Sequence, residues 1–119
     1  MSKSVFGKDD CLTMVLGNDF KRPKWLLTGD AVTALANFKR EYGDDLRAAS
    51  IAFACQFAKH LTLLDTDVKH RPNDIVVGKT AKHELVITII GKSYHPYMRT
   101  EIGYSPVAFT EIFAAWRPK

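Results

Sequence analysis

Residues 44–64 read DDLRAASIAFACQFAKHLTLL, and this stretch decides the expected fold. It consists largely of good helix formers, and Gly43 and Asp44 ahead of it suit a turn and a helix N-cap. At about 100° per residue, its large apolar side chains fall on one stripe, formed by Leu46, Phe53, Phe57 and Leu64. Polar side chains are few between Ala48 and Cys55. The pattern therefore predicts a central helix that is covered on most of its sides.

Two further helices are expected on either side of this segment. Residues 30–42 place apolar side chains at helical spacing and end in basic residues, and Gly43 follows as a stop. Near the C-terminus, Ser105 suits an N-cap and Pro106 the first helical position. The residues after them that repeat at helical spacing are Phe109, Ile112, Phe113 and Trp116. The sequence thus predicts a helical pair and a short C-terminal helix.

Strands are expected where β-branched residues concentrate. Residues 84–90 (ELVITII) and 74–78 (DIVVG) read as an antiparallel pair joined by the loop KTAKH. Residues 11–16 and 24–27 form a second candidate hairpin, in which Pro23 restricts the second strand to a sheet edge.

The grouping of strands and helices predicts an α+β fold in one domain spanning residues 1–119. We expect a two-layer sandwich, in which an antiparallel sheet of about four strands is covered by the central helix, the helical pair and the short C-terminal helix. A mainly helical domain with one hairpin is the alternative.

Composition favours a protein that folds alone in the cytoplasm. Apolar residues make up 46% and charged residues 25% of the chain, values typical of soluble globular proteins. Neither a secretory signal nor a run of about 20 apolar residues is present. Of the two cysteines, Cys55 is expected to be a buried, inert thiol. The net charge of +4 is spread evenly, so it permits a polyanionic partner without requiring one.

Catalytic and cofactor motifs are missing from the sequence, which disfavours an enzyme and predicts no cofactor. Asp65, Asp67 and His70, followed by Asp74, are the best candidates for a small metal-dependent active site, because carboxylates and imidazole bind divalent ions. A solvated connector explains the same residues better, and we predict no metal ligands.

Two segments combine tyrosine or tryptophan with basic residues. The first carries Tyr94, Tyr97, Arg99 and Tyr104, and the second carries Arg22, Lys24 and Trp25. If the two segments lie side by side, they form one basic-aromatic face. The alternative is that the rings are packed against the sheet.

These residues predict a small non-catalytic binding or regulatory module that recognises a protein partner or a second copy of itself. The alternative is a protein that binds single-stranded nucleic acid with the same face, because aromatic rings stack on bases and basic side chains contact phosphates.

Overall fold

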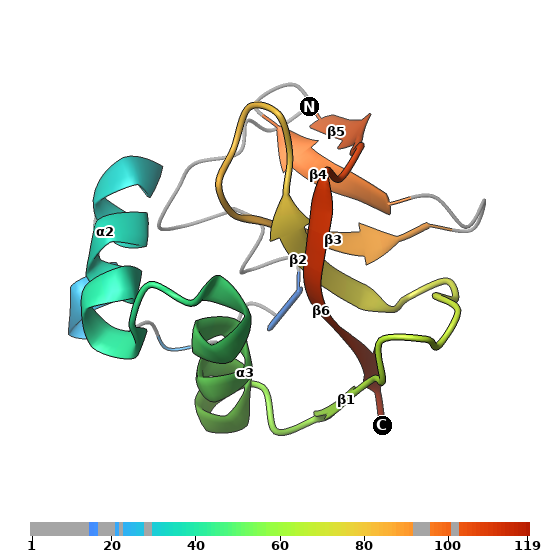
Figure 1. Cartoon of the computed structure of the whole chain (residues 1–119), viewed down its shortest axis with the longest axis horizontal. Helices are drawn as coiled ribbons and strands as arrows, with labels where there is room; N and C mark the ends of the chain where they lie inside the picture. Colours follow the sequence, from blue (N-terminus) through green and yellow to red (C-terminus); the bar gives the residue numbers. More distant parts are fainter. Residues whose placement is uncertain (1–14, 17–20, 22, 28–29, 92–95, 101–102) are drawn as a thin grey trace.

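The computed structural model of the chain describes residues 15–16, 21, 23–27, 30–91, 96–100 and 103–119 (Figure 1). Its elements are η1 (Lys24–Leu26), α2 (Ala31–Tyr42), α3 (Leu46–Phe57), β1 (Leu61–Leu63), β2 (Ile75–Lys79), β3 (Val86–Ile90), β4 (Pro96–Thr100), β5 (Gly103–Pro106) and β6 (Glu111–Pro118). In the described residues, the helices α2 and α3 together with an antiparallel sheet confirm the α+β class. No helix in these described ranges has the length and apolar character needed to cross a membrane.

Both α2 and α3 are capped by an aspartate that precedes the first helical residue. The carboxylate of Asp30 accepts hydrogen bonds from the first backbone N–H groups of α2, and Asp45 does the same for α3. These bonds satisfy donors that a helix N-terminus leaves without an internal partner. α2 stops at Gly43, whose φ of 96° lies in the region that favours glycine. The expected stop is therefore confirmed.

Among the described residues, the sheet has six strands in the order β1-β6-β2-β3-β4-β5, and every neighbouring pair is antiparallel. β2 and β3 form the expected hairpin, whose loop is closed by a 2.9 Å hydrogen bond from Thr80 N–H to the His83 carbonyl. β2 occupies the middle, because β6 pairs with its other edge. The sheet thus has more strands than the four or so expected.

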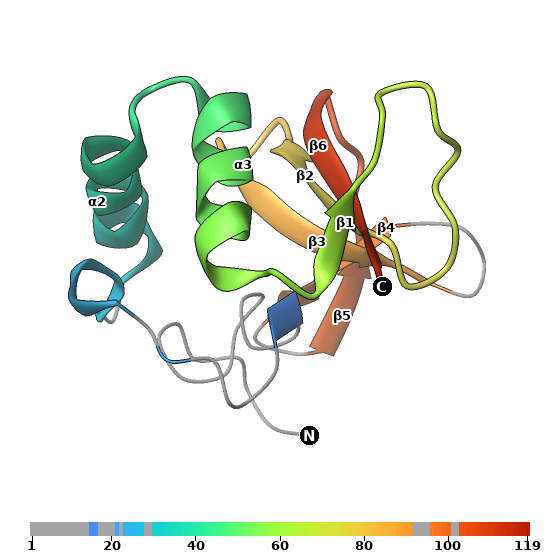
Figure 2. The same ribbon diagram turned by 90° about the horizontal axis from the view of Figure 1, so that it is seen from below.

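Both faces of β2 are buried. Ile75 and Val77 belong to a cluster that includes Ala54 of α3, whereas Val76 lies in a separate cluster with residues of β3 and β6. Figure 2 shows α3 between α2 and the sheet, while no helix of the described residues lies over the other sheet face. Partly buried Leu64 and Phe109, from segments outside the strands, pack on that second face.

The expected C-terminal helix is wrong, because residues 103–106 and 111–118 are strands. The apolar residues at helical spacing divide between the two faces of the sheet: Phe109 packs in the cluster of Val76, and Trp116 packs in the cluster of Ile75. β6 pairs with β1 on one side and β2 on the other. Long-range pairing of this kind overrides local helical periodicity.

Two other boundaries differ from expectation. The helix expected over residues 44–64 ends at Phe57, and β1 follows within the same stretch. Residues 24–26 form a 3-10 helix instead of a strand, after Pro23 at the N-cap position. The partner proposed for that strand, residues 11–16, lies mostly outside the described residues.

α3 is covered on one side only. Ala49, Ser50 and Ala54 are buried, whereas Ala48, Ala52 and Cys55 are exposed. The expectation that α3 is covered on most sides is therefore wrong, and so is the expectation of a buried Cys55. The reason is that α2 and the sheet contact α3 on its buried side and leave the opposite side open (Figure 2).

Candidate functional site

The β4–β5 hairpin groups three of the predicted binding residues. Its register places Arg99 opposite Tyr104, and Tyr97 lies two residues before Arg99. Since successive residues of a strand alternate between the two faces, Tyr97, Arg99 and Tyr104 share one face of the hairpin. We call these three residues the hairpin face. Tyr94, the fourth residue predicted for this segment, lies outside the described residues.

The hairpin face lies at the end of the sheet that is far from the helices. α3 packs on β6, and two strands, β2 and β3, separate β6 from β4. Figure 1 shows β4 and β5 on the opposite side of the molecule from α2. The register also pairs Tyr97 with Ile89, so the hairpin face continues the sheet face that carries Ile75.

The second predicted segment has a packed aromatic residue at its centre. The ring of Trp25 lies 6.2 Å from that of Phe38, 5.9 Å from that of Tyr42 and 6.2 Å from that of Phe53, measured between centroids. These are distances of direct ring contact. Trp25 thereby attaches η1 to α2 and α3.

The basic residues around Trp25 differ in their surroundings. Lys24 is exposed next to it on η1, whereas Arg22 lies outside the described residues. Two large apolar side chains nearby, Leu27 and Val32, are 66% and 79% exposed. The surface around η1 thus combines a cation with exposed apolar groups, while the tryptophan is half-buried behind it.

The two predicted segments are not side by side. Figures 1 and 2 both show η1 beside α2, at the end of the molecule remote from β4 and β5. Within the described residues, the two segments therefore do not form a single basic-aromatic face, and the hairpin face and the η1 surface are separate.

The acidic connector after β1 does not gather its side chains into a metal site. Asp65 and Asp67 are exposed, His70 is half-buried and Asp74 is buried. Within the described part of the chain, which includes all four residues, no group of three His, Cys, Asp or Glu side chains is arranged to hold a metal ion. The alternative of a metal-dependent enzyme at this place has no geometric support.

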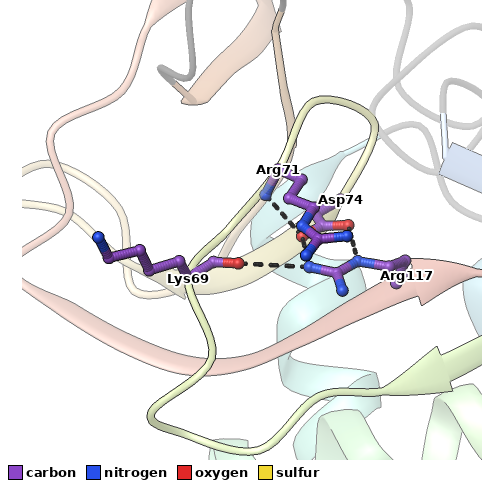
Figure 3. Close-up of polar contacts among 4 residues, drawn as sticks. All are labelled: Lys69, Arg71, Asp74 and Arg117. Atoms are coloured by element: carbon purple, nitrogen blue, oxygen red, sulfur yellow. Dashed lines mark hydrogen bonds and ion pairs between the residues drawn. The ribbon is translucent and has the colours of Figure 1, made fainter.

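Asp74 instead forms an ion pair with Arg117, in which the Asp74 side chain is buried and the Arg117 side chain is partly exposed (Figure 3). Arg117 donates from Nε to Oδ1 and from Nη2 to Oδ2, both at 2.9 Å, and the backbone N–H of Arg71 donates to Oδ2 at 2.8 Å. Arg117 Nη2 also lies 3.3 Å from the carbonyl oxygen of Lys69. The pair thus joins the connector to the end of β6.

The pKa of Asp74 reflects two opposing effects. Burial raises it, but the hydrogen bonds from Arg117 and Arg71, together with the positive charge of Arg117, outweigh burial and hold the pKa below its ordinary value of 3.8. The carboxylate is therefore ionised at neutral pH and engaged in the structure. Sequence patterns missed this pair, because Arg117 follows a segment that reads as helical.

A shallow depression lies between the start of α3 and the β2–β3 hairpin. Its charged lining residues are Asp44, Asp45, Arg47, Lys79, Glu84 and Glu111. Several are already engaged: Arg47 donates to the Phe113 carbonyl at 2.5 Å, and Lys79 lies 3.7 Å from Glu111. The lining residues do not include a histidine, cysteine or serine that is suited to nucleophilic chemistry.

Comparisons with protein-family models, with curated proteins and with solved structures found no match to this chain. The site is therefore interpreted from its own geometry.

Proposed function

We propose that this chain is a non-catalytic protein-binding module and that it recognises its partner with the hairpin face. The observation that carries the proposal is the pairing of Arg99 with Tyr104, which groups two tyrosines and an arginine at one end of the sheet. Tyrosine and arginine are enriched in protein interfaces, where they contribute a large share of the binding energy.

The position of the hairpin supports this proposal. β5 is the outer strand of the described sheet and pairs with β4 alone. An outer strand offers backbone donors and acceptors to an extended segment of a partner, and side chains beside it supply specificity. A partner that adds a strand to β5 would bring its own side chains next to Tyr104.

The proposal is tested by comparing three face variants, Tyr97→Ala, Arg99→Ala and Tyr104→Ala, with Ser105→Ala as the matched control. Ser105 pairs with Met98 and therefore lies on the opposite face of the same hairpin. Quantitative mass spectrometry of proteins bound to the immobilised chain should give a partner that is lost with each face variant and kept with Ser105→Ala. The purified partner should then bind with a dissociation constant raised at least tenfold by Tyr104→Ala.

A binding assay with a labelled single-stranded oligonucleotide distinguishes the alternative function, nucleic-acid binding, from protein binding. If the oligonucleotide binds, and its affinity falls steeply with salt in a manner that depends on Arg99, then the hairpin face serves nucleic acid and the protein-binding proposal is wrong. A partner retained equally by all three face variants would also contradict the proposal.

A further inference from the structure

β1 forms one outer edge of the described sheet and pairs with β6 alone. In an antiparallel pair, the backbone groups of successive residues point alternately toward the partner strand and away from it. The Leu64 N–H donates to the Ala115 carbonyl at 2.9 Å, so Leu64 and Thr62 point their backbone groups toward β6. Those of Leu61 and Leu63 therefore point to the outer edge. In Figure 2, where β1 lies in front of β6, no described helix or strand covers this edge.

The outer edge of β1 carries backbone groups that no described residue satisfies. The N–H and C=O of Leu63 and the C=O of Leu61 have no hydrogen-bond partner in the described part of the chain, and neither has the N–H of Asp65, the next outward position. Pro118, opposite Leu61, has no N–H to donate. The Leu63 side chain is also 42% exposed. The edge thus offers both the hydrogen bonds and the apolar contact that a further strand requires.

The charges that flank β1 indicate which strand this is. Lys59 is exposed just before β1, and Asp65 and Asp67 are exposed just after it. None of these three side chains forms an ion pair with a described residue. The edge therefore runs from a basic end to an acidic end. Such an edge is complementary to itself when a second copy lies antiparallel, because each basic end then meets the acidic end of the other copy.

We infer that β1 pairs antiparallel with β1 of a second copy of this chain, about a two-fold axis at Leu63, so that the two sheets become continuous. Each Leu63 N–H then donates to the Leu63 carbonyl of the other copy, and each Asp65 N–H donates to the Leu61 carbonyl of the other copy. The two Leu63 side chains lie across the axis at about 4.5–5.5 Å between Cβ atoms, which covers their exposed surface. Asp67 of each copy lies at the same end as Lys59 of the other.

The contact is small, so the dimer is a weak one. A strand of three residues with its flanking positions buries less than the roughly 1,200–2,000 Å² of a standard stable interface. The inference does not rest on the proposed function, because β1 and β5 lie at opposite ends of the strand order. It adds that the dimer presents two copies of the hairpin face, which raises the apparent affinity for a partner with two binding sites.

Amide hydrogen exchange of the purified protein, followed by NMR in a dilute and in a concentrated sample, tests the pairing directly. The Leu63 and Asp65 amides should exchange at least about tenfold more slowly in the concentrated sample, because only the second copy gives them acceptors. The Leu64 amide is the internal control, since its bond to Ala115 exists in the monomer and protects it in both samples. A Leu63 amide that exchanges equally fast in both samples, or one protected in a sample that sedimentation shows to be monomeric, would overturn the inference.

A charge at the axis gives a second test by sedimentation equilibrium. Leu63→Lys should raise the dimer dissociation constant at least about tenfold, because it places two like charges directly opposite each other. The matched control is Ile112→Lys, since Ile112 is similarly exposed, at 48%, but pairs with Gly78 at the end of β6 that β1 does not reach. A dimer that persists in Leu63→Lys, or one weakened equally by Ile112→Lys, would overturn the inference.

Charge reversal tests the antiparallel order. Lys59→Asp and Asp67→Lys should each raise the dimer dissociation constant about fivefold, because each reversal acts at both ends of a two-fold pair. The double variant should recover most of the loss. Circular dichroism checks that the single variants keep the fold. A double variant that dimerises no better than the single variants would overturn the antiparallel arrangement.

Discussion

At the scale of single residues, two buried polar groups differ in whether they have a hydrogen-bond partner. The Asp74 carboxylate is 1% exposed and is bonded by Arg117 and by the backbone of Arg71. The Thr88 hydroxyl is also buried, but it has no hydrogen-bond partner within the described structure. Removing one partner of a buried ion pair costs much stability because it leaves an uncompensated charge, whereas an unpaired buried hydroxyl costs stability as long as it is present.

The Asp74–Arg117 pair should make the free energy of unfolding depend on pH in the acid range. Since the pKa of Asp74 is lower in the folded than in the unfolded chain, its contribution is fully present above about pH 4 and is lost as the pH falls through the folded-state value. Asp74→Asn should lower the free energy of unfolding by about 3 kcal/mol at neutral pH and flatten its dependence below pH 4, measured by urea unfolding. Asp65→Asn, at an exposed acid of the same connector, is the control. An unchanged acid profile in Asp74→Asn would contradict the role of the pair.

Thr88→Val should stabilise the protein. Valine has the shape of threonine without the hydroxyl, so the change removes a buried polar group that no described residue satisfies. We expect the free energy of unfolding to rise by about 1 kcal/mol and the Tm by about 4 °C in calorimetry. Thr110→Val is the control, because the Thr110 hydroxyl donates to the Lys79 carbonyl at 3.2 Å and its loss should not stabilise. A lower Tm for Thr88→Val would show that the hydroxyl has a partner in solution.

At the scale of elements, helix caps and ring contacts determine where the helices begin and how they pack. Helical periodicity alone determines this less. The turn between α2 and α3 contains two consecutive aspartates, and the sequence alone favours Asp44 as the cap. In the structure, Asp45 accepts from the backbone N–H groups of Arg47 and Ala48. The choice between two adjacent aspartates depends on backbone angles that the sequence pattern does not reveal.

This difference is directly measurable. Asp45→Ala should lower the free energy of unfolding by about 1 kcal/mol, because two N–H groups lose their acceptor. Asp44→Ala should leave it nearly unchanged, because Asp44 makes no capping bond to α3. Urea denaturation curves of the two variants measure this difference. Equal losses of unfolding free energy would show that the assignment of Asp45 as the cap is wrong.

Trp25 offers a second prediction at this scale. Because its ring contacts those of Phe38, Tyr42 and Phe53, Trp25→Ala should lower the free energy of unfolding by about 2–3 kcal/mol, less than for a fully buried tryptophan. Lys24→Ala, at its exposed neighbour, should have almost no effect on thermal unfolding. If Trp25→Ala leaves the Tm unchanged, the cluster does not anchor η1 in solution, and the ring is available for binding as the sequence first suggests.

At the scale of the whole molecule, local patterns predict the fold class and fail at long-range pairing. The β2–β3 hairpin and α2 are predicted well, because their strand-forming residues, turn and caps are local. β6 is not predicted, since only its pairing with β1 and β2 overrides the helical spacing that ends at Trp116. The sequence predicts the residues of the hairpin face as a group. It does not predict that Arg99 lies opposite Tyr104, because that depends on the register of β4 against β5.

The same strand order predicts a gradient of local stability across the sheet. β2 is paired on both edges and buried on both faces, whereas β1 and β5 are the outer strands of the described sheet. Native-state hydrogen exchange should therefore give the backbone amides of Val76 and Val77 protection close to that for global unfolding, while amides of β5 exchange through local opening. Exchange of β5 should slow selectively when a partner adds a strand to it, and β1 should not respond. Equal protection of β5 and β2 in the free protein would mean that β5 is already covered, and the outer strand would then not be open to a partner.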